Sequence, residues 1–198
     1  MLACLSLLTA SAAASGSSLP QQRILIVNSE GGVFQPLVTQ MNQTALEALK
    51  QRFGTNTEIA VESLDLDRFG WAGHAERMAT ALEQKYASRR PEGVIAVTEG
   101  ALQFVLKYRQ RLLGGTDIPI AHMAVRHAHV PQIHAEHQNV HGAGVDFSAL
   151  PVFQAIRQMQ PEVERVVIIT GAAPVDLVWE QHLKEQGRLL EGPLRAEF

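Results

Sequence analysis

The chain has 198 residues, of which 46% are hydrophobic and 19% are charged, and its formal net charge is −3. This composition is that of an ordinary folded protein, and it argues against a disordered chain and against a surface that coats nucleic acid. The length suffices for one α/β domain with its own core, or for one full lobe of a two-lobed protein and part of a second.

The N-terminal residues have the pattern of a secretory leader. Met1–Ala14 is apolar and ends in small residues that offer Ala-x-Ala at Ala12 and Ala14, and a Ser/Gly/Pro spacer follows. We expect residues 1–22 to be a signal peptide and spacer and the mature protein to lie in the periplasm; an apolar N terminus that frays is the alternative. The single cysteine, Cys4, falls in this leader, so we expect no disulfide and no thiolate metal site in the mature chain.

Beyond the leader, short apolar runs alternate with amphipathic stretches. The apolar runs predict strands at Arg23–Asn28, Thr57–Glu62, Gly93–Val97 and Ile118–Ala121. Apolar residues at helical spacing predict helices from Pro36 to Gly54, from His74 to Arg89 and from about Gly100 to Leu113. The order β-α-β-α-β-α-β requires crossover connections and a parallel sheet covered on both faces. The predicted fold class is therefore α/β, with a doubly wound parallel sheet of the Rossmann-like kind.

A second block follows a histidine-rich stretch that has little periodicity. It contains residues 140–147, a helix at about Ala149–Met159, a strand at Arg165–Thr170 and a helix at about Pro174–Leu190. One strand cannot bury both faces of the helices beside it. We therefore interpret residues 23–145 as a first α/β lobe and residues 146–198 as a partial second lobe, either incomplete or completed by another chain.

The loops after the predicted strands carry the candidate ligand-binding residues. In an open parallel sheet, loops and helix N termini converge beyond the carboxyl ends of the strands, and ligands bind there. These loops mix glycines with short polar groups that can reach a small polar ligand. The predicted ligand-binding residues are Asn28, Ser29, Glu30, Thr98, Glu99, Arg126 and Asp146. The alternative is that they are only helix caps and turn residues.

We find no catalytic signature. The chain has no Gly-x-x-x-x-Gly-Lys-Ser/Thr, no Gly-x-Ser-x-Gly and no His-Glu-x-x-His. Gly142–Phe147 holds only a partial dinucleotide fingerprint, and we interpret it as a hinge turn. We therefore expect no catalytic residue, no enzymatic activity and no organic cofactor.

Six of the eight histidines lie between His122 and His141. The pairs His127-x-His129 and His134-x-x-His137 have spacings from which imidazoles can bind zinc, copper or nickel. These four histidines are the predicted ligands of a divalent metal. The alternative is a solvated loop whose histidines do not converge, and we interpret His122, inside an apolar strand, as a core group with its hydrogen bonds satisfied.

Three spaced motifs carry a family resemblance. They are the run Val61–Phe69, then Leu82-x-x-Lys85-Tyr86, and then Pro91-x-Gly93-Val94-Ile95-Ala96. In this order they resemble the ABC-transporter substrate-binding-like domain that forms the periplasmic sensor of bacterial histidine kinases, over about Arg23 to Ile169. The resemblance implies a type I periplasmic-binding-protein fold, in which two Rossmann-like lobes close on a small molecule around a hinge. It also implies that the family's transmembrane helix and kinase core, where present, lie beyond Phe198.

The expected function is therefore a periplasmic small-molecule sensor domain at the N terminus of a two-component histidine kinase. The alternative is the solute-binding component of an ABC importer. A third hypothesis, from another class, is a periplasmic metal-binding protein that uses the loop from His127 to His141. The expected partners are a small-molecule ligand and a membrane kinase or permease, with no nucleic acid and no membrane span within the chain.

Overall fold

The computed structural model describes residues 22–31, 36–54, 56–172, 174–190 and 194–198. The predicted signal peptide lies outside the described residues. Within them, no helix is both long enough and apolar enough to cross a membrane.

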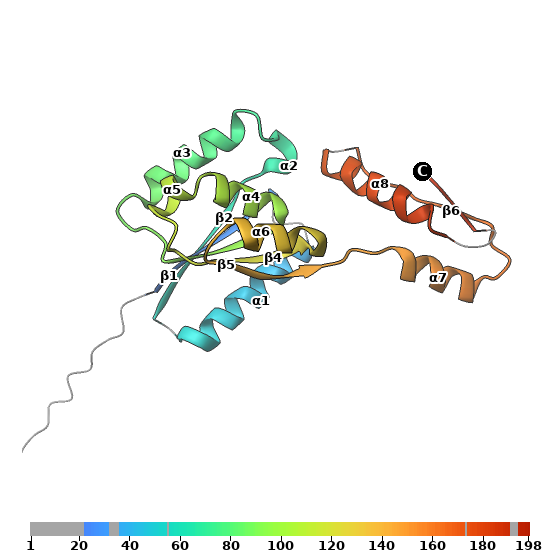
Figure 1. Cartoon of the computed structure of the whole chain (residues 1–198), viewed down its shortest axis with the longest axis horizontal. Helices are drawn as coiled ribbons and strands as arrows, with labels where there is room; N and C mark the ends of the chain where they lie inside the picture. The colour runs from blue at the N-terminus through green and yellow to red at the C-terminus, as the bar shows by residue number, and fades with distance from the viewer. Residues whose placement is uncertain (1–21, 32–35, 55, 173, 191–193) are drawn as a thin grey trace, which may run out of the picture.

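A five-stranded parallel sheet forms the larger part of the molecule (Figure 1). Its strands are β1 (Gln22–Asn28), β2 (Thr57–Ser63), β3 (Gly93–Val97), β4 (Ile120–Arg126) and β5 (Val140–Val145). They lie in the order β2-β1-β3-β4-β5, and every neighbouring pair is parallel. β2 lies at an edge, as its alternating pattern predicts, and the order reverses between β1 and β3. The predicted doubly wound α/β class is confirmed.

Helices cover both faces of this sheet, because successive side chains of a strand point to opposite sides. Ile26 packs beneath α1 (Pro36–Phe53) on one face. Leu25 and Val27 belong to the larger core on the other face. That face carries α3 (His74–Tyr86), α4 (Glu99–Lys107) and α5 (Arg109–Leu113), with α2 (Leu66–Phe69) and α6 (Val130–Glu136) at its margins (Figure 1).

Several predicted elements of the first sheet and its helices differ from the observed ones. β4 begins and ends later than the strand expected over Ile118–Ala121, and β5 was not identified as a strand. The helix expected over 100–113 is divided at Tyr108, where the backbone φ is −105° and ψ is 14°. The histidine-rich stretch is structured: η1 (His127–His129) and α6 connect β4 to β5. Its polar residues conceal the periodicity, because α6 contacts the core mainly through Val130 and Ile133.

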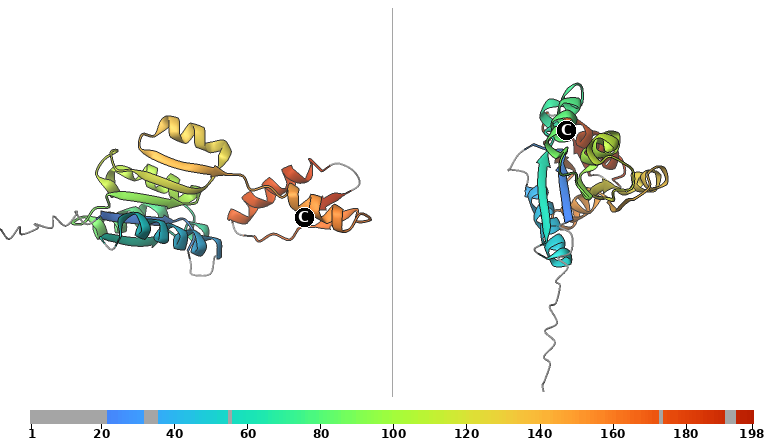
Figure 2. Two further views of the ribbon diagram at one scale, coloured as in Figure 1. Left: turned by 90° about the horizontal axis from the view of Figure 1, so that it is seen from below. Right: turned by 90° about the vertical axis from the view of Figure 1, so that its left-hand side faces the viewer.

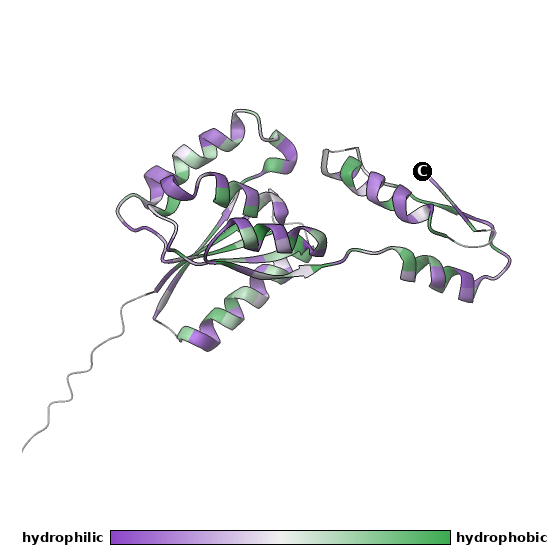
Figure 3. Ribbon diagram, viewed as in Figure 1, coloured by the Kyte–Doolittle hydropathy of each residue, from purple (hydrophilic) through white to green (hydrophobic). Residues whose placement is uncertain are grey.

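Four further elements follow β5: α7 (Leu150–Met159), β6 (Arg165–Val167), α8 (Pro174–Gly187) and β7 (Arg195–Glu197). β6 and β7 form a two-stranded parallel sheet, so β7 was missed and the strand expected over 165–170 is shorter. An extended segment after β5 joins this part to the first sheet (Figure 2). Apolar residues occur along α7 and α8 as well as along the central strands (Figure 3). The assignment of residues 146–198 as a partial second lobe stays a prediction.

Candidate functional site

The loops after β1 and β3 meet at the carboxyl edge of the sheet. The hydroxyls of Ser29 and Thr98 lie 2.5 Å apart, and Thr98 Oγ1 lies 3.5 Å from Glu30 Oε2. Gly100 allows this approach, because a Cβ there would lie 2.9 Å from Ser29 Cβ. The point at which the strand order reverses thus brings together residues that are almost seventy positions apart in the chain.

Thr98 has a backbone conformation that side-chain-bearing residues rarely adopt. Its φ is 78° and its ψ is 163°, a region occupied almost only by glycine, and such strain costs about 1–3 kcal/mol. Neighbouring elements hold this conformation: Thr98 N–H donates to Met123 O at 2.9 Å, and Thr98 O accepts from Leu102 N–H at 3.2 Å. The strained residue is therefore held between the middle of β4 and the first turn of α4.

Glu30 lies partly buried beside these hydroxyls. Burial raises the pKa of its carboxyl, and the neighbouring charge of Asp67 adds to the rise. Hydrogen bonds from Ser29, from the Glu30 backbone and from Thr98 oppose it without cancelling it. The loop is held at its next residue, because Gly31 N–H donates to Asp67 Oδ1 at 3.1 Å.

Asn28 occupies a different position from that expected of a ligand contact. Its side chain is 2% exposed, so it lies behind the loop. Its backbone carbonyl accepts from Leu64 N–H at 2.9 Å, while Oδ1 has no hydrogen-bond partner among the described residues. The reason is that β1 continues in register with β2 and β3 through Asn28, and beyond it the chain first becomes partly exposed at Glu30.

Glu99, the first residue of α4, connects the β3 loop to the end of β4. Its carboxylate lies 3.2 Å from Arg126 Nε and 2.7 Å from His129 Nδ1. Burial by itself would raise the pKa of Glu99, but the hydrogen bonds from Arg126 and His129 outweigh it, and the net pKa is lowered. Glu99 is therefore an ionised carboxylate that anchors two cationic or polar side chains near the mouth of the site.

A cavity of about 420 Å³ opens where the chain leaves β5. Arg126, His129 and Asp146 line it from the side of the first sheet. Phe147, Trp179 and His182 line it from the connecting segment and from α8. The Trp179 ring meets Phe147 edge to face, with centroids 5.0 Å apart. This volume lies in the range of small-molecule sites.

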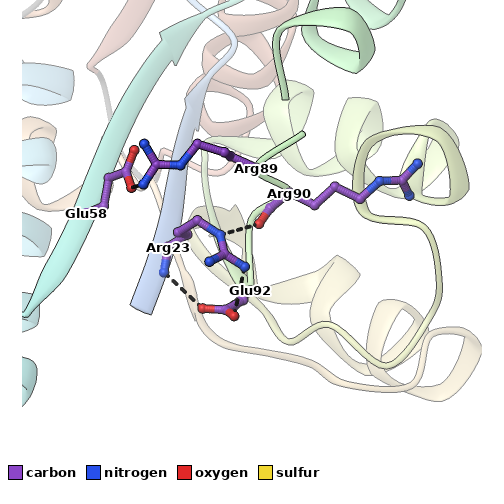
Figure 4. Close-up of polar contacts among 5 residues, drawn as sticks. All are labelled: Arg23, Glu58, Arg89, Arg90 and Glu92. Carbon is purple, nitrogen blue, oxygen red and sulfur yellow. Dashed lines mark hydrogen bonds and ion pairs between the residues drawn. The ribbon is translucent and has the colours of Figure 1, made fainter. Parts of the chain in front are cut away.

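The opposite edge of the sheet is closed by ion pairs (Figure 4). Arg23 donates to Arg90 O at 2.8 Å and to Glu92 Oε1 at 2.9 Å, and Arg89 donates to Glu58. The cavity beside them is smaller, at about 150 Å³. Because the charged groups shown in this close-up are mostly paired with one another, we place the candidate site at the carboxyl edge.

The four predicted metal ligands do not gather at one point. His129 contacts Glu99, and His134 Nε2 lies 3.0 Å from Nε2 of His122. Among the described residues, no group of three or more histidine, cysteine or acidic side chains could hold a metal ion. The reason is that η1 and α6 place the histidines on separate turns. His127 and His137 take part in neither the His129–Glu99 contact nor the His134–His122 contact.

His122 differs from the satisfied core group that its strand context suggests. It is buried, at 3% exposed, but its Nδ1 has no hydrogen-bond partner among the described residues. Burial, with a contribution from His134, lowers its pKa.

Known structures share this architecture. A conserved domain protein from Vibrio cholerae superposes with a TM-score of 0.61 at 15% identity, over 89% of this chain and 57% of that one. An ABC domain in complex with L-Trp from Streptococcus pneumoniae gives 0.60 at 14% identity, over 89% and 56%. A substrate-binding protein with adhesive properties from Clostridium difficile, ligand-free and open, gives 0.56 at 16% identity, over 89% and 56%. The chain has the type I periplasmic-binding-protein fold.

The chain spans a little over half the length of these three structures. No protein-family model and no curated protein matches its sequence. Identities of this size establish the periplasmic-binding-protein fold alone.

In this fold, six of the seven predicted ligand-binding residues lie along one edge. Ser29, Glu30 and Thr98 form one contact group, Glu99 and Arg126 form a second, and Asp146 lies with Arg126 at the cavity. Sequence reasoning missed the opposite wall, which Phe147, Trp179 and His182 provide. The signal available was Trp179-x-x-His182-x-x-x-Gln186, whose spacing places all three side chains on one face of a helix.

Proposed function

We propose that this chain binds a small polar molecule at the carboxyl edge of its five-stranded sheet. The observation that carries the proposal is a row of polar contacts from β1 to β4 that leads to the 420 Å³ cavity. Arg126 belongs both to this row and to the lining of the cavity, and Glu99 holds its guanidinium there, so a ligand that the cavity encloses meets the row at Arg126.

Unfavourable local features at the same edge support a functional rather than a purely structural role. Thr98 is strained, Gly100 is tightly packed, and the Glu30 carboxyl is desolvated. Backbone strain and perturbed pKa values concentrate at functional sites. A turn that served only to connect β3 to α4 would not require all three.

For the whole protein, we propose a periplasmic sensor domain that reports ligand binding to a membrane histidine kinase. The solute-binding component of an ABC importer is supported equally, since one similar structure is a substrate-binding protein and another holds L-Trp. The two roles are separated by their outputs: a sensor's ligand changes kinase phosphorylation, whereas an importer's ligand accumulates in the cell. Metal binding by the loop from His127 to His141 has less support, because those histidines face different partners.

A thermal-shift screen of the chain against amino acids, small carboxylates and amines tests the ligand-binding proposal. A ligand at 100 times its Kd adds about 2.7 kcal/mol of stability. For a protein of this size we expect a rise in Tm of about 5–10 °C. Thr98→Ala should reduce the rise.

The matched control is Thr44→Ala, because Thr44 is exposed on α1 and its hydroxyl donates to Gln40 O within that helix. This variant should keep the full rise in Tm. A ligand that stabilises Thr98→Ala and Arg126→Ala as much as the wild type would place the site elsewhere. A screen without any stabilising compound would refute the proposal.

A further inference from the structure

The polar groups that line the 420 Å³ cavity differ in whether they have a partner. Arg126 and His129 both contact Glu99, at 3.2 Å and 2.7 Å. His182 Nε2 lies 2.6 Å from Phe147 O. Asp146, in contrast, makes no hydrogen bond or ion pair with any described residue, and its side chain is exposed to the cavity. The cavity therefore presents one carboxylate that forms no direct pair with a described residue.

The wall next to Asp146 is aromatic. Trp179 is 38% exposed, and its ring contacts Phe147 at 5.0 Å and His182 at 5.9 Å between centroids. The side chain of Gln186 holds this wall, since its amide nitrogen donates to Phe147 O at 3.0 Å and lies 2.7 Å from His182 Nε2. The indole therefore has a defined position from which it can pack against an apolar group.

We propose that this cavity selects an organic cation: an ammonium group on an apolar or aromatic body. The ammonium lies beside Asp146, and the body packs against Trp179 and Phe147. This inference rests on the proposed ligand-binding function and specifies its ligand class.

The electrostatics favour a cation over an anion. A carboxylate ligand would approach the unpaired charge of Asp146, while the positive charge of Arg126 is already engaged by Glu99. An ammonium gains a charge-assisted hydrogen bond to Asp146 and an attraction to the aromatic faces. Both gains increase when the ligand displaces water from the cavity.

Isothermal titration calorimetry with two matched probes tests the sign of the charge. 2-Phenylethylamine and 3-phenylpropionate share a ring and a two-carbon chain, but one carries an ammonium and the other a carboxylate. We expect the amine to bind at least about tenfold more tightly, as one charge-assisted hydrogen bond would produce. Asp146→Asn should weaken amine binding by about tenfold and leave the weak binding of the carboxylate unchanged or improved.

Three further variants make the result specific. Glu47→Gln removes one negative charge from the exposed side of α1 and should leave both affinities unchanged. Asp146→Glu keeps the charge and should retain most of the amine affinity, which separates the loss of charge from a failure to fold. Trp179→Leu should weaken the amine by several-fold, because it removes the aromatic surface.

Three outcomes would overturn the inference: no binding of the amine, equal or tighter binding of the carboxylate, or full amine affinity in Asp146→Asn. If the thermal-shift screen still finds a ligand that depends on Thr98, the proposed function stands and only the ligand class is wrong. If the screen finds no ligand at all, both proposals fail.

Discussion

Gly100→Ala should destabilise the protein although alanine favours a helix. The added Cβ would lie 2.9 Å from Ser29 Cβ, which is about 0.6 Å short of a normal carbon–carbon contact of roughly 3.5 Å. Ser29 directly follows β1 and is buried, so α4 must move away, at a typical overpacking cost of about 1–3 kcal/mol. This movement also lengthens the hydrogen bond between Ser29 and Thr98, worth about 0.5–1.5 kcal/mol. The higher helix propensity of alanine offsets about 0.5–1 kcal/mol of this cost, so the free energy of unfolding should fall by about 1–3 kcal/mol.

Urea unfolding followed by far-UV circular dichroism measures this loss. With a slope of about 2 kcal/mol per molar, the midpoint should fall by about 0.5–1.5 M while the slope stays constant. Gly115→Ala is the matched control, because no atom lies within 4 Å of its added Cβ, and it should change stability by less than about 0.5 kcal/mol. Ser29→Gly in the Gly100→Ala background removes the clash and should recover about 1 kcal/mol through coupling of the two sites. Equal midpoints for the two alanine variants would refute the packing argument.

Three more predictions concern buried polar groups. Arg109→Met should lower the free energy of unfolding, measured in urea, by about 2–4 kcal/mol, because the buried guanidinium donates to three backbone carbonyls. Arg109→Lys should lower it less. A methionine variant as stable as the wild type would contradict this argument. Because the folded-state pKa of Glu30 is raised, its ionised form costs stability above that pKa, so Glu30→Gln should raise Tm at neutral pH. The advantage should disappear below about pH 4.5, where the group is protonated in both states, and a destabilised variant at neutral pH would reverse the expected sign. The folded-state pKa of His122 is lowered, so the unfolded chain takes up the proton first and the urea midpoint should fall as the pH decreases below 6.5. His122→Gln should make the midpoint depend less on pH. An equally steep fall in the variant would assign the pH dependence to another group.

The sequence predicted four of the five strands of the first sheet, and their parallel pairing, more reliably than the ends of the elements. The apolar run before Asn28 and the run at Gly93–Val97 each lie in a strand that is largely buried, and burial on both faces requires such continuous runs. The helix expected over 100–113 divides at Tyr108 because Arg109 turns inward to reach carbonyls of the loop before β4 and of Gln138. No local pattern marks such a long-range contact.

The candidate site was only half predictable. Polar residues after parallel strands must meet at one edge, so Ser29 and Thr98 could be paired by topology alone. The aromatic wall could not, because Trp179 reaches the cavity only through the path of the chain after β5. The histidine spacing suggested a shared metal site, but the turns of η1 and α6 direct His129 toward Glu99 and His134 toward His122.

The sequence alone therefore determined the alternation of strands and helices, the parallel sheet and the edge at which its polar loops converge. These follow from local periodicity and from the chirality of crossover connections, which act over short stretches of chain. Tertiary structure decided which of those polar residues are buried, as Asn28 is, and which are paired, as Arg126 is with Glu99. It also decided that Asp146 lies unpaired beside an aromatic wall. The burial of a side chain and the pairing of its charge depend on neighbours distant in the sequence, so the folded structure determines them and local sequence patterns do not.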